Sequence, residues 1–480
     1  MHESRELATW AADLRYRDLP ELVREKMRIS ILDNIGCQIA GATLPWSKAF
    51  YEVIAATRSG THSTVVYYGN KLAPDDAAFL NSAFNHANEM DDTHFKSPTH
   101  PGGIAVPAAL AMAEYAWATG KQVMVAVAAA YEVQIRIAWA CSPHLSKRGH
   151  HPPVGVGPFG SAVAAGLLLR FDAARMLHAM GIAGSHSAGI SEYTKTGGSV
   201  KRIHSALPTQ AGVRSALFAE AGITGPASVL EGEKGFCKVF AGSYDSDRLI
   251  GNLGTTYHLL DTGLKPHACP HFMQAALDAI DNLREKHPLV SNDISSITVY
   301  ANEAVLGHVC AITEPTDVLG AQFSLPFSLA MRLHHGGRGV HGGNGFWDYP
   351  KVNVRDPSLV ATARKIRRYD PGKPVRIQVD QGIGLEVETT AGQRFFEIVP
   401  YSRGLSENPM TLEEVKEKFK SLVEPLLPAG APQKIIDLVD ALDQVKDINE
   451  LLCLLVVPAP AAGLPGRQSS LAKNTPLHSR

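Results

Sequence analysis

The first half of the chain repeats the hydrophobic periodicity of amphipathic helices. Across residues 21–42 apolar side chains recur at three- and four-residue spacing, which predicts a helix, and Asp18 is its expected N-cap. Pro74, followed by two aspartates, predicts the start of another helix, since proline and acidic side chains both favour the first helical turn. Alanine- and glycine-rich helical segments then follow one another. We therefore expect residues 1–264 to form the first part of an all-helical domain.

The pattern changes after His271, where short alternating segments lie between helical ones. Residues 294–300 (ISSITVY) and 375–380 (VRIQVD) alternate and are rich in β-branched side chains, so each predicts a strand. Two strand-like arms around Ala391-Gly392 predict a hairpin. Because helical periodicity continues between these strands, we expect residues 265–402 to form a smaller α+β domain.

Helical periodicity returns beyond this second domain. Residues 403–456 contain three helical segments, which we expect to pack back on the first domain. Residues 457–480 are rich in Pro, Ala, Gly and Ser and lack apolar periodicity, which predicts a disordered tail. The predicted fold class is therefore mainly α, with a smaller α+β domain.

Composition and charge exclude several classes of protein. The chain has 480 residues, of which 45% are apolar and 19% charged, so it can bury a large core in two domains. A net charge of −1 and a pI near 7.1 argue against a nucleic-acid-binding surface. The six cysteines form no CxxC pair, so we expect buried free thiols rather than disulfides or a zinc site.

Neither a secretory signal nor a membrane span is expected. The N-terminal residues are typical of a helix and contain no apolar signal region. The apolar stretch 123–140 contains Glu132 and Arg136, which favours a core helix over a membrane span. We therefore expect a cytoplasmic protein without membrane or nucleic-acid partners.

Side chains suited to acid–base chemistry concentrate between residues 89 and 103. Glu89, Asp91, Asp92, His94 and His100 lie where prolines interrupt a helix. Imidazoles whose pKa is tuned by neighbouring carboxylates suit proton transfer near neutral pH. The alternative is that the aspartates cap a helix end or pair with a distant arginine.

Two basic segments follow. Residues 147–155 (KRGHHPPVG) carry a histidine pair before a turn, and residues 196–204 (TGGSVKRIH) place glycines before Lys201 and Arg202. The second segment is typical of a turn in which backbone N–H groups and a cation hold an anion. It is not a Walker A loop, because GxxxxGK[ST] is absent. Each segment is equally compatible with a solvated surface loop.

Two more segments contain clustered histidines. Residues 265–271 (KPHACPH) stand at the predicted domain junction, where ligands often bind, although a structured linker is the alternative. His334, His335 and His341 suggest a metal site, but no Asp, Glu or Cys stands at ligand spacing beside them. We therefore expect no metal there.

Taken in order, these segments resemble the MmgE/PrpD family, which includes 2-methylcitrate dehydratase, cis-aconitate decarboxylase and iminodisuccinate epimerase. The resemblance extends from ILDNIGCQIAG to the helices near residue 450. Its most specific mark is the acidic-x-Asp-Asp-Thr segment followed by His-Pro. GHHPP, GGSVKRIH, K-P-x-x-C-x-H and AQFSLPFSLA follow in the expected order.

The resemblance implies a set of functional residues. The catalytic residues would be Asp91, Asp92, Thr93, His100, His151, Lys201 and His271, and the substrate-binding residues Glu89, Arg202, His204 and Phe327. His151 is preferred over His150 because it directly precedes Pro-Pro. This chain departs from the family pattern at Glu89, where Asp is common, and at Phe327, where many members carry a tyrosine.

The resemblance also implies a cofactor-independent lyase acting on a small di- or tricarboxylate. Lys201 would bind carboxylates and stabilise developing charge, His100 and His151 would exchange protons, and His271 would complete the site from a lid. The architecture would be a large helical domain from both chain ends plus an α+β lid, in a homodimer.

The loss of the tyrosine hydroxyl at Phe327 favours a 2-methylcitrate dehydratase-like reaction over decarboxylation of cis-aconitate or epimerisation of iminodisuccinate. A metal-dependent hydrolase and a non-catalytic binding protein remain as alternatives of other classes.

Overall fold

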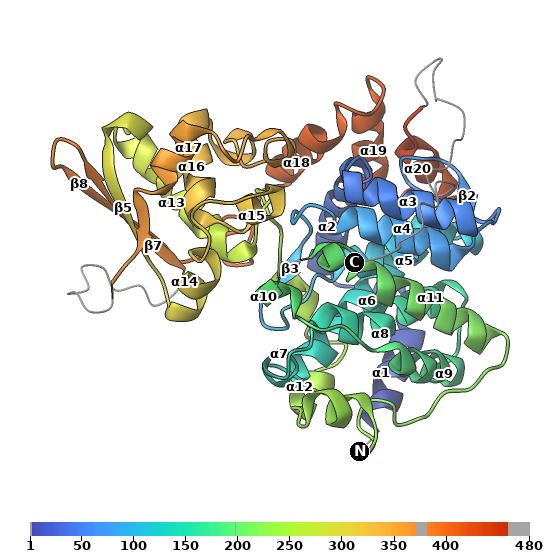
Figure 1. Ribbon diagram of the computed structural model, residues 1–480. Coiled ribbons are helices and arrows are strands. Elements are labelled where there is room, and N and C mark those ends of the chain that lie inside the picture. The colour runs from blue at the N-terminus through green and yellow to red at the C-terminus, as the bar shows by residue number, and fades with distance from the viewer. Residues whose placement is uncertain (1, 197, 371–381, 459–480) are drawn as a thin grey trace, which may run out of the picture.

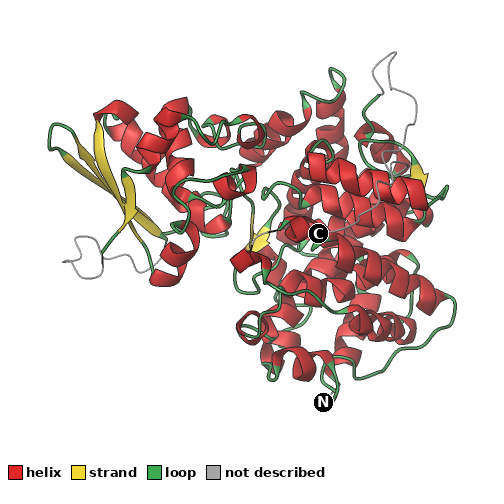
Figure 2. Cartoon of the chain, in the orientation of Figure 1, coloured by secondary structure: helices red, strands yellow, loops and turns green. Residues whose placement is uncertain are grey.

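The described part of the chain forms a large helical lobe and a smaller lobe that contains a sheet (Figures 1 and 2). The computed structural model describes residues 2–196, 198–370 and 382–458. The helices of the large lobe that precede the small lobe are α1 (Glu3–Asp13), α2 (Glu21–Gly41), α3 (Pro45–Thr57), α4 (Pro74–Asn85), α5 (Gly102–Tyr115), α6 (Gly120–Ala140), α7 (His144–Lys147), α8 (Pro152–Leu168), α9 (Ala173–Ala183), α10 (Tyr193–Thr196), α11 (Ala206–Glu220) and α12 (Ser246–Ile250).

Helix α8 packs against both α6 and α11 in the core of the large lobe. Thr119 and Gln122 form a capping box that begins α6. Gly212 lets α11 approach α8 closely, because a Cβ atom there would lie 2.0 Å from Ser161 Oγ. Helix α6 is long and apolar enough to cross a membrane, but 94% of its most apolar window is buried inside the protein, as in a core helix.

A four-stranded sheet in the order β6-β5-β7-β8 organises the small lobe. Strand β5 (Ile294–Tyr300) pairs parallel with β6 (Ile366–Arg368) and antiparallel with β7 (Ile383–Thr389), which forms a hairpin with β8 (Arg394–Val399). The predicted strand 294–300 and the predicted hairpin are therefore confirmed, while the predicted strand 375–380 lies outside the described residues. The helices of this lobe are α13 (His271–Lys286), α14 (Glu303–Val309), α15 (Val318–Gln322), α16 (Leu325–His335) and α17 (Pro357–Ala363).

The last helices return to the large lobe, where α18 and α19 contact α2. They are α18 (Leu412–Val423), α19 (Ala431–Asp440) and α20 (Asn449–Leu452). Helix α18 packs against α2, where Lys418 Nζ lies 2.6 Å from Asp33 Oδ1 with both side chains completely buried. The predicted fold class, mainly α with a smaller α+β part, is confirmed. Of the predicted disordered tail, residues 459–480 lie outside the described part of the chain.

The structure differs from the sequence prediction at two kinds of position. Asp18 is not the N-cap of α2, which begins after Pro20. Its carboxylate instead accepts a hydrogen bond from the Arg15 N–H at 2.9 Å. The large lobe is also not purely helical, because it contains the two-residue strands β1 (Ser63–Thr64), β2 (Lys71–Leu72), β3 (Thr93–His94) and β4 (Thr262–Gly263). Such short strands carry no alternating pattern that a sequence could display.

Candidate active site

The pairing of β3 with β4 brings two distant segments together. Thr93 lies opposite Gly263 and His94 opposite Thr262 in an antiparallel pair. The acidic segment that follows α4 therefore lies beside the segment 265–271, which leads into the small lobe. A site at the junction of the lobes follows directly from this pairing.

A cavity of about 410 Å³ opens where these segments meet, a volume typical of small-molecule sites. Six predicted site residues line it, namely Glu89, Thr93, His100, His151, Lys201 and His271. Lys265, His150, Tyr193 and Phe323 line it as well. Asp91, Asp92, Arg202 and His204 lie behind this wall and contact the lining residues. The structure thus brings ten of the eleven predicted residues together.

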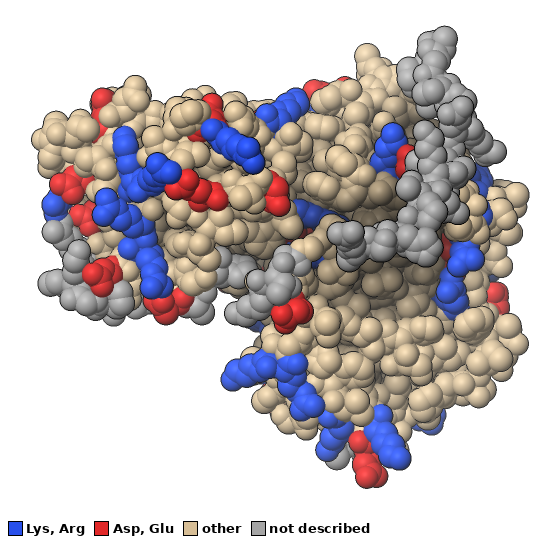
Figure 3. All heavy atoms as spheres, viewed as in Figure 1, with Lys and Arg blue, Asp and Glu red and all other residues tan. Residues whose placement is uncertain are grey.

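The outer surface carries no comparable concentration of one charge on the face drawn in Figure 3. Basic and acidic side chains are interspersed over the small lobe, and much of the large lobe carries neither on this face. The surface is indented between the lobes. This face therefore offers no basic patch for an anionic ligand.

Glu89 is the centre of a buried cluster of cations. Its carboxylate accepts hydrogen bonds from Lys201 and from Arg202 Nη1 (3.1 Å), and Lys265 Nζ lies 3.9 Å from its second oxygen. Burial acts to raise the pKa of Glu89, but the cations outweigh burial and hold this pKa far below its usual range. Three cations therefore share one ionised carboxylate, which leaves an excess of positive charge for an anionic substrate.

Lys201 contacts both a carboxylate and an imidazole. Besides Glu89, its Nζ lies 3.5 Å from His86 Nε2. Burial lowers the pKa of the Lys201 ammonium, although Glu89 opposes this shift. The neighbouring Arg202 guanidinium lies over the Trp46 ring at 5.1 Å, which holds it behind the cavity wall.

Asp91 joins two imidazoles beneath the cavity. Its Oδ2 lies 2.7 Å from His86 Nδ1 and 3.6 Å from His100 Nδ1. Burial acts to raise the pKa of Asp91, but the contact with His86 overcomes this effect and holds the pKa well below its usual range. Asp91 therefore remains ionised and orients the His86 ring through this hydrogen bond.

Asp92 takes part in the site through its backbone carbonyl as well as through its side chain. The carboxyl accepts hydrogen bonds from the Tyr131 hydroxyl at 2.5 Å and the Gly102 N–H at 3.0 Å. Burial raises the pKa of Asp92 to about 7, although the Tyr131 hydrogen bond opposes the shift. The Asp92 carbonyl lies 2.8 Å from His100 Nδ1.

This carbonyl fixes the tautomer of His100. A carbonyl oxygen can only accept, so Nδ1 carries the proton and Nε2 keeps its lone pair. Burial, opposed by Asp91, lowers the pKa of His100 to about 3. His100 is therefore a neutral imidazole near pH 7, and no hydrogen bond occupies its Nε2 among the residues that the structure describes.

Another part of the cavity wall carries a second pair of histidines. His151, at the start of α8, places its Nδ1 2.9 Å from His204 Nδ1. The Tyr193 ring lies 5.5 Å from the His151 ring and 5.3 Å from the His204 ring. Burial lowers the pKa of His204 to about 4, and it lowers the pKa of His151 well below its usual range. This wall therefore also presents neutral imidazoles.

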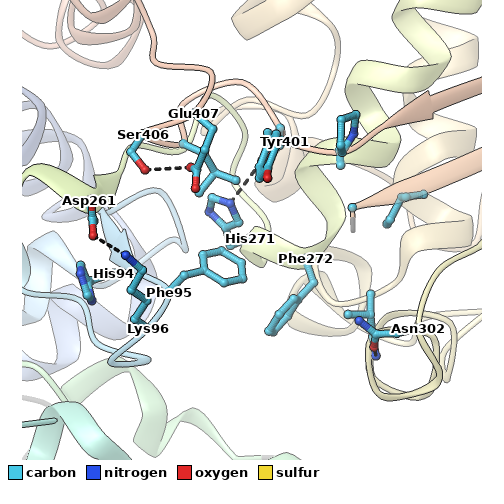
Figure 4. A pocket seen from close by; sticks show the side chains of 17 residues that line it. His94, Phe95, Lys96, Asp261, His271, Phe272, Asn302, Tyr401, Ser406 and Glu407 are labelled. Carbon is cyan, nitrogen blue, oxygen red and sulfur yellow. Dashed lines mark hydrogen bonds and ion pairs between the residues drawn. The ribbon is translucent and has the colours of Figure 1, made fainter. Parts of the chain in front are cut away.

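His271, at the start of α13, lies between the first cavity and a second one of about 350 Å³, which Figure 4 shows. Its Nε2 is hydrogen-bonded to Ser402 Oγ at 3.2 Å, and the Phe95 ring packs against it at 4.5 Å. Burial lowers the pKa of His271 to about 3. In the second cavity Lys96 is already paired with Asp261 at 2.7 Å, so the first cavity is the better anion site.

Phe327 does not line the cavity, contrary to the expectation of a substrate contact. Its ring is completely buried within the small lobe, in the first turn of α16. Phe323 forms the aromatic wall instead, with its ring 5.9 Å from Lys201 Nζ. Phe323 precedes Ser324, the N-cap of α16, so its direction is not set by that helix.

Sequence reasoning did not assign His86, Lys265 or Tyr193 to the site. Lys265 belongs to the same short segment as His271, and that proximity was an available signal. His86 follows the last turn of α4, where its contact with Asp91 depends on how the chain leaves the helix. Tyr193 lies in a segment without a recognisable motif.

One group of side chains has the composition of a metal site. Ligand atoms of His86, Asp91 and His100 lie within 4.8 Å of one another. However, His86 Nδ1 already bonds Asp91, and His100 Nδ1 donates to the Asp92 carbonyl. The Lys201 ammonium beside His86 also opposes a further cation. Hydrogen bonding therefore explains this group, and the absence of a metal remains a prediction.

The histidines of the loop after α16 have separate partners. His334 Nε2 lies 2.8 Å from Thr362 Oγ1, and His341 Nε2 lies 2.9 Å from Glu417 Oε1. Within the described ranges these rings do not form a cluster of metal ligands.

A helical lobe, an α+β lobe and a cavity of imidazoles and lysines between them provide the groups that acid–base catalysis uses. The sequence profile of the MmgE/PrpD N-terminal domain matches residues 5–248, and that of the MmgE/PrpD C-terminal domain matches residues 267–444. The chain belongs to the MmgE/PrpD family and is a lyase, so both predictions are confirmed.

Characterised relatives are similar over almost the whole chain. A cis-aconitate decarboxylase of Aspergillus terreus is 29% identical over 474 residues, which cover 94% of this chain and 96% of the relative. A cis-aconitate decarboxylase-like protein of Aspergillus oryzae is 26% identical with the same coverage. The human cis-aconitate decarboxylase is 26% identical and covers 94% of each chain.

Proposed function

We propose that this protein is a decarboxylase that releases CO2 from a small unsaturated tricarboxylate of the cis-aconitate type. The observation that carries the proposal is the cavity in which Lys201 and Lys265 face the neutral imidazoles of His100, His151 and His271. The names of the relatives favour decarboxylation. Phe327, which favoured a 2-methylcitrate dehydratase, lies outside the cavity, so dehydration becomes the second candidate.

The substrate would bind to the positive charge of the cation cluster that Glu89 does not neutralise. Two carboxylates of the substrate would pair with the ammonium groups of Lys201 and Lys265, whose charges Glu89 only partly compensates. Because the side chains of Lys201 and Lys265 are buried, these ion pairs would also stabilise charge that develops during the reaction.

Decarboxylation requires the site to stabilise an anion and to supply a proton. When the C–C bond to one carboxylate breaks, CO2 leaves, and the electron pair is delocalised through the C=C bond onto another carboxylate. A proton must then be added to carbon. The lysine ammonium groups would stabilise the delocalised anion, and an imidazolium would supply the proton.

His100 is the proposed proton donor. In the free enzyme its pKa of about 3 leaves it neutral. A polycarboxylate in the cavity would raise this pKa, because nearby negative charge favours the protonated ring. Nε2 would therefore take up a proton as substrate binds and deliver it to carbon, while Nδ1 remains bonded to the Asp92 carbonyl.

Product analysis distinguishes the candidate reactions. The purified protein is incubated separately with cis-aconitate, citrate, 2-methylcitrate and iminodisuccinate, and the products are identified by NMR. We expect CO2 and a dicarboxylate from cis-aconitate. Loss of water from 2-methylcitrate or epimerisation of iminodisuccinate, without turnover of cis-aconitate, would contradict the proposal in favour of another reaction of the family. Activity that requires stoichiometric zinc or iron would favour the metal-dependent alternative.

A homodimer and a cytoplasmic location, both expected from the sequence, belong to this proposal. Light scattering of the purified protein tests the first expectation.

A further inference from the structure

Gln322, at the end of α15 in the small lobe, contacts the cation cluster of the large lobe. Its side chain is completely buried. Oε1 accepts a hydrogen bond from Arg202 Nη2 at 3.0 Å. Nε2 donates to Asn88 Oδ1 and to the Ala268 carbonyl, each at 2.9 Å. One amide therefore joins the three segments that meet at the cavity.

Gln322 contacts Asn88, which is the chain neighbour of a residue with a strained backbone. Asn88 immediately precedes Glu89, whose φ of 57° lies in the left-handed region that non-glycine residues rarely adopt. Asn88 Nδ2 also donates to the Phe346 carbonyl of the small lobe at 3.2 Å. Such a conformation persists only where the surroundings hold it, and here Gln322 supplies part of that hold.

Glu89 is thus fixed from two directions by one side chain of the other lobe. Through Asn88, Gln322 holds the backbone that leads into Glu89. Through Arg202, it holds a guanidinium that donates to the Glu89 carboxylate at 3.1 Å. The same carboxylate oxygen accepts the hydrogen bond of Lys201.

We propose that Gln322 is a positioning residue for the lyase reaction, which fixes Glu89 through Asn88 and Arg202 and thereby places the ammonium group of Lys201. The proposal rests on the proposed role of Lys201 in binding substrate. Gln322 does not line the cavity, so it acts only through these partners.

A neutral amide suits this position because it donates and accepts at once. Arg202 requires an acceptor, whereas Asn88 Oδ1 and the Ala268 carbonyl require a donor. A carboxylate would compete with Glu89 for Arg202 and would repel both acceptors. An apolar side chain would leave buried polar groups on both sides without partners.

The test replaces Gln322 with an apolar side chain of similar length. In Gln322→Met we expect kcat to fall by roughly tenfold to a hundredfold, since small displacements of a catalytic constellation have effects of this size. The control is Gln38→Met in α2, which exchanges another completely buried glutamine outside the cavity. This control should keep the wild-type kcat.

The pH dependence of the reaction rate distinguishes a positioning role of Gln322 from a merely structural one. The groups nearest the Lys201 ammonium are Glu89, His86, Lys265, Arg202 and Phe323, and its charge also acts on three further histidines, His100, His151 and His204. Glu89 raises the pKa of Lys201, whereas burial, Lys265 and Arg202 lower it. If Glu89 moves away, the pKa of Lys201 falls, so the alkaline limb of the rate profile shifts to lower pH in Gln322→Met.

The pKa of Lys201 is also measured without catalysis, from the rate of its acetylation by acetic anhydride as a function of pH. This readout separates the proposal from the proposed function, because it needs no substrate. A Gln322→Met protein with wild-type kcat and an unshifted Lys201 titration would overturn the proposal. If this variant does not fold, Asn88→Ala breaks the same link from the large lobe, and an unshifted Lys201 titration in that variant would be equally decisive.

Discussion

At the scale of single residues, a backbone contact determines what His100 can do. The Asp92 carbonyl fixes the proton on Nδ1, and burial keeps the ring neutral, so Nε2 is left as the reactive atom. A histidine on a solvated loop would exchange tautomers and would have a pKa near 6.5. The neighbouring chain therefore supplies the chemical character of this residue.

Exchanging His100 for asparagine tests this assignment. The asparagine amide can replace the Nδ1–H that bonds the Asp92 carbonyl, but it has no atom in place of Nε2. We therefore expect His100→Asn to lower kcat by about a hundredfold or more with little change in thermal stability. His178→Asn on α9, remote from the cavity lining, is the matched control. A His100→Asn variant with more than a tenth of wild-type kcat would exclude Nε2 as the proton donor.

Sequence spacing indicated most of these side chains because each stands in a short segment of unusual composition. It did not indicate Lys265 or Tyr193 as site residues, because their role depends on which neighbour turns toward the cavity. For the same reason it assigned Phe327 to the site instead of Phe323. Both are apolar aromatic residues of one segment. Phe323 lies before the N-cap of α16 and Phe327 lies inside the helix, so the two side chains point in different directions.

At the scale of elements, α18 links the end of the chain to the acidic segment. Lys418 pairs with Asp33 on α2 and also donates to the Met90 carbonyl at 2.9 Å, one residue before Asp91. The helical periodicity of α18 was visible in the sequence, and so were strand β5 and the β7–β8 hairpin. The β3–β4 pairing, which brings the site together, was not visible because two residues cannot show a period.

Removing one partner of this buried ion pair should be costly. In Lys418→Met, Asp33 is left as an uncompensated buried charge, so we expect a loss of about 3–5 kcal/mol in the free energy of unfolding. Asp33→Asn combined with Lys418→Met removes both charges and should recover much of that loss. Urea denaturation of the two single variants and the double variant measures the coupling. Strictly additive losses would show that the pair does not interact.

At the scale of the whole molecule, the core at the lobe junction contains several histidines held in the neutral form. Burial lowers the pKa of His100 and His271 to about 3 and that of His204 and His94 to about 4. Unfolding restores values near 6.5, so the unfolded chain binds more protons between these limits. The stability that these rings contribute is complete above pH 6.5 and is lost as the pH falls toward 4. Asp92 and Asp278, whose pKa values burial raises to about 7 and about 6, act in the opposite direction, but the histidines outnumber them.

Acidification from pH 7 to pH 5 should therefore destabilise the protein by roughly 1–2 kcal/mol for each buried histidine, less the contributions of Asp92 and Asp278. Chemical denaturation across this range measures the change. His204→Asn should lower the slope of stability against pH by about the equivalent of one proton. A free energy of unfolding that is constant or higher at pH 5 would contradict the neutral state of these rings.

The central claim is that one positively charged cavity between the lobes cleaves a carbon–carbon bond of a tricarboxylate. The rate of CO2 release from cis-aconitate by the wild type, Lys201→Met and Lys96→Met tests it most directly. We expect release by the wild type, a loss of at least about a hundredfold in Lys201→Met, and the wild-type rate in Lys96→Met, whose lysine lies in the second cavity. No release by the wild type, or equal rates in the wild type and Lys201→Met, would contradict the account.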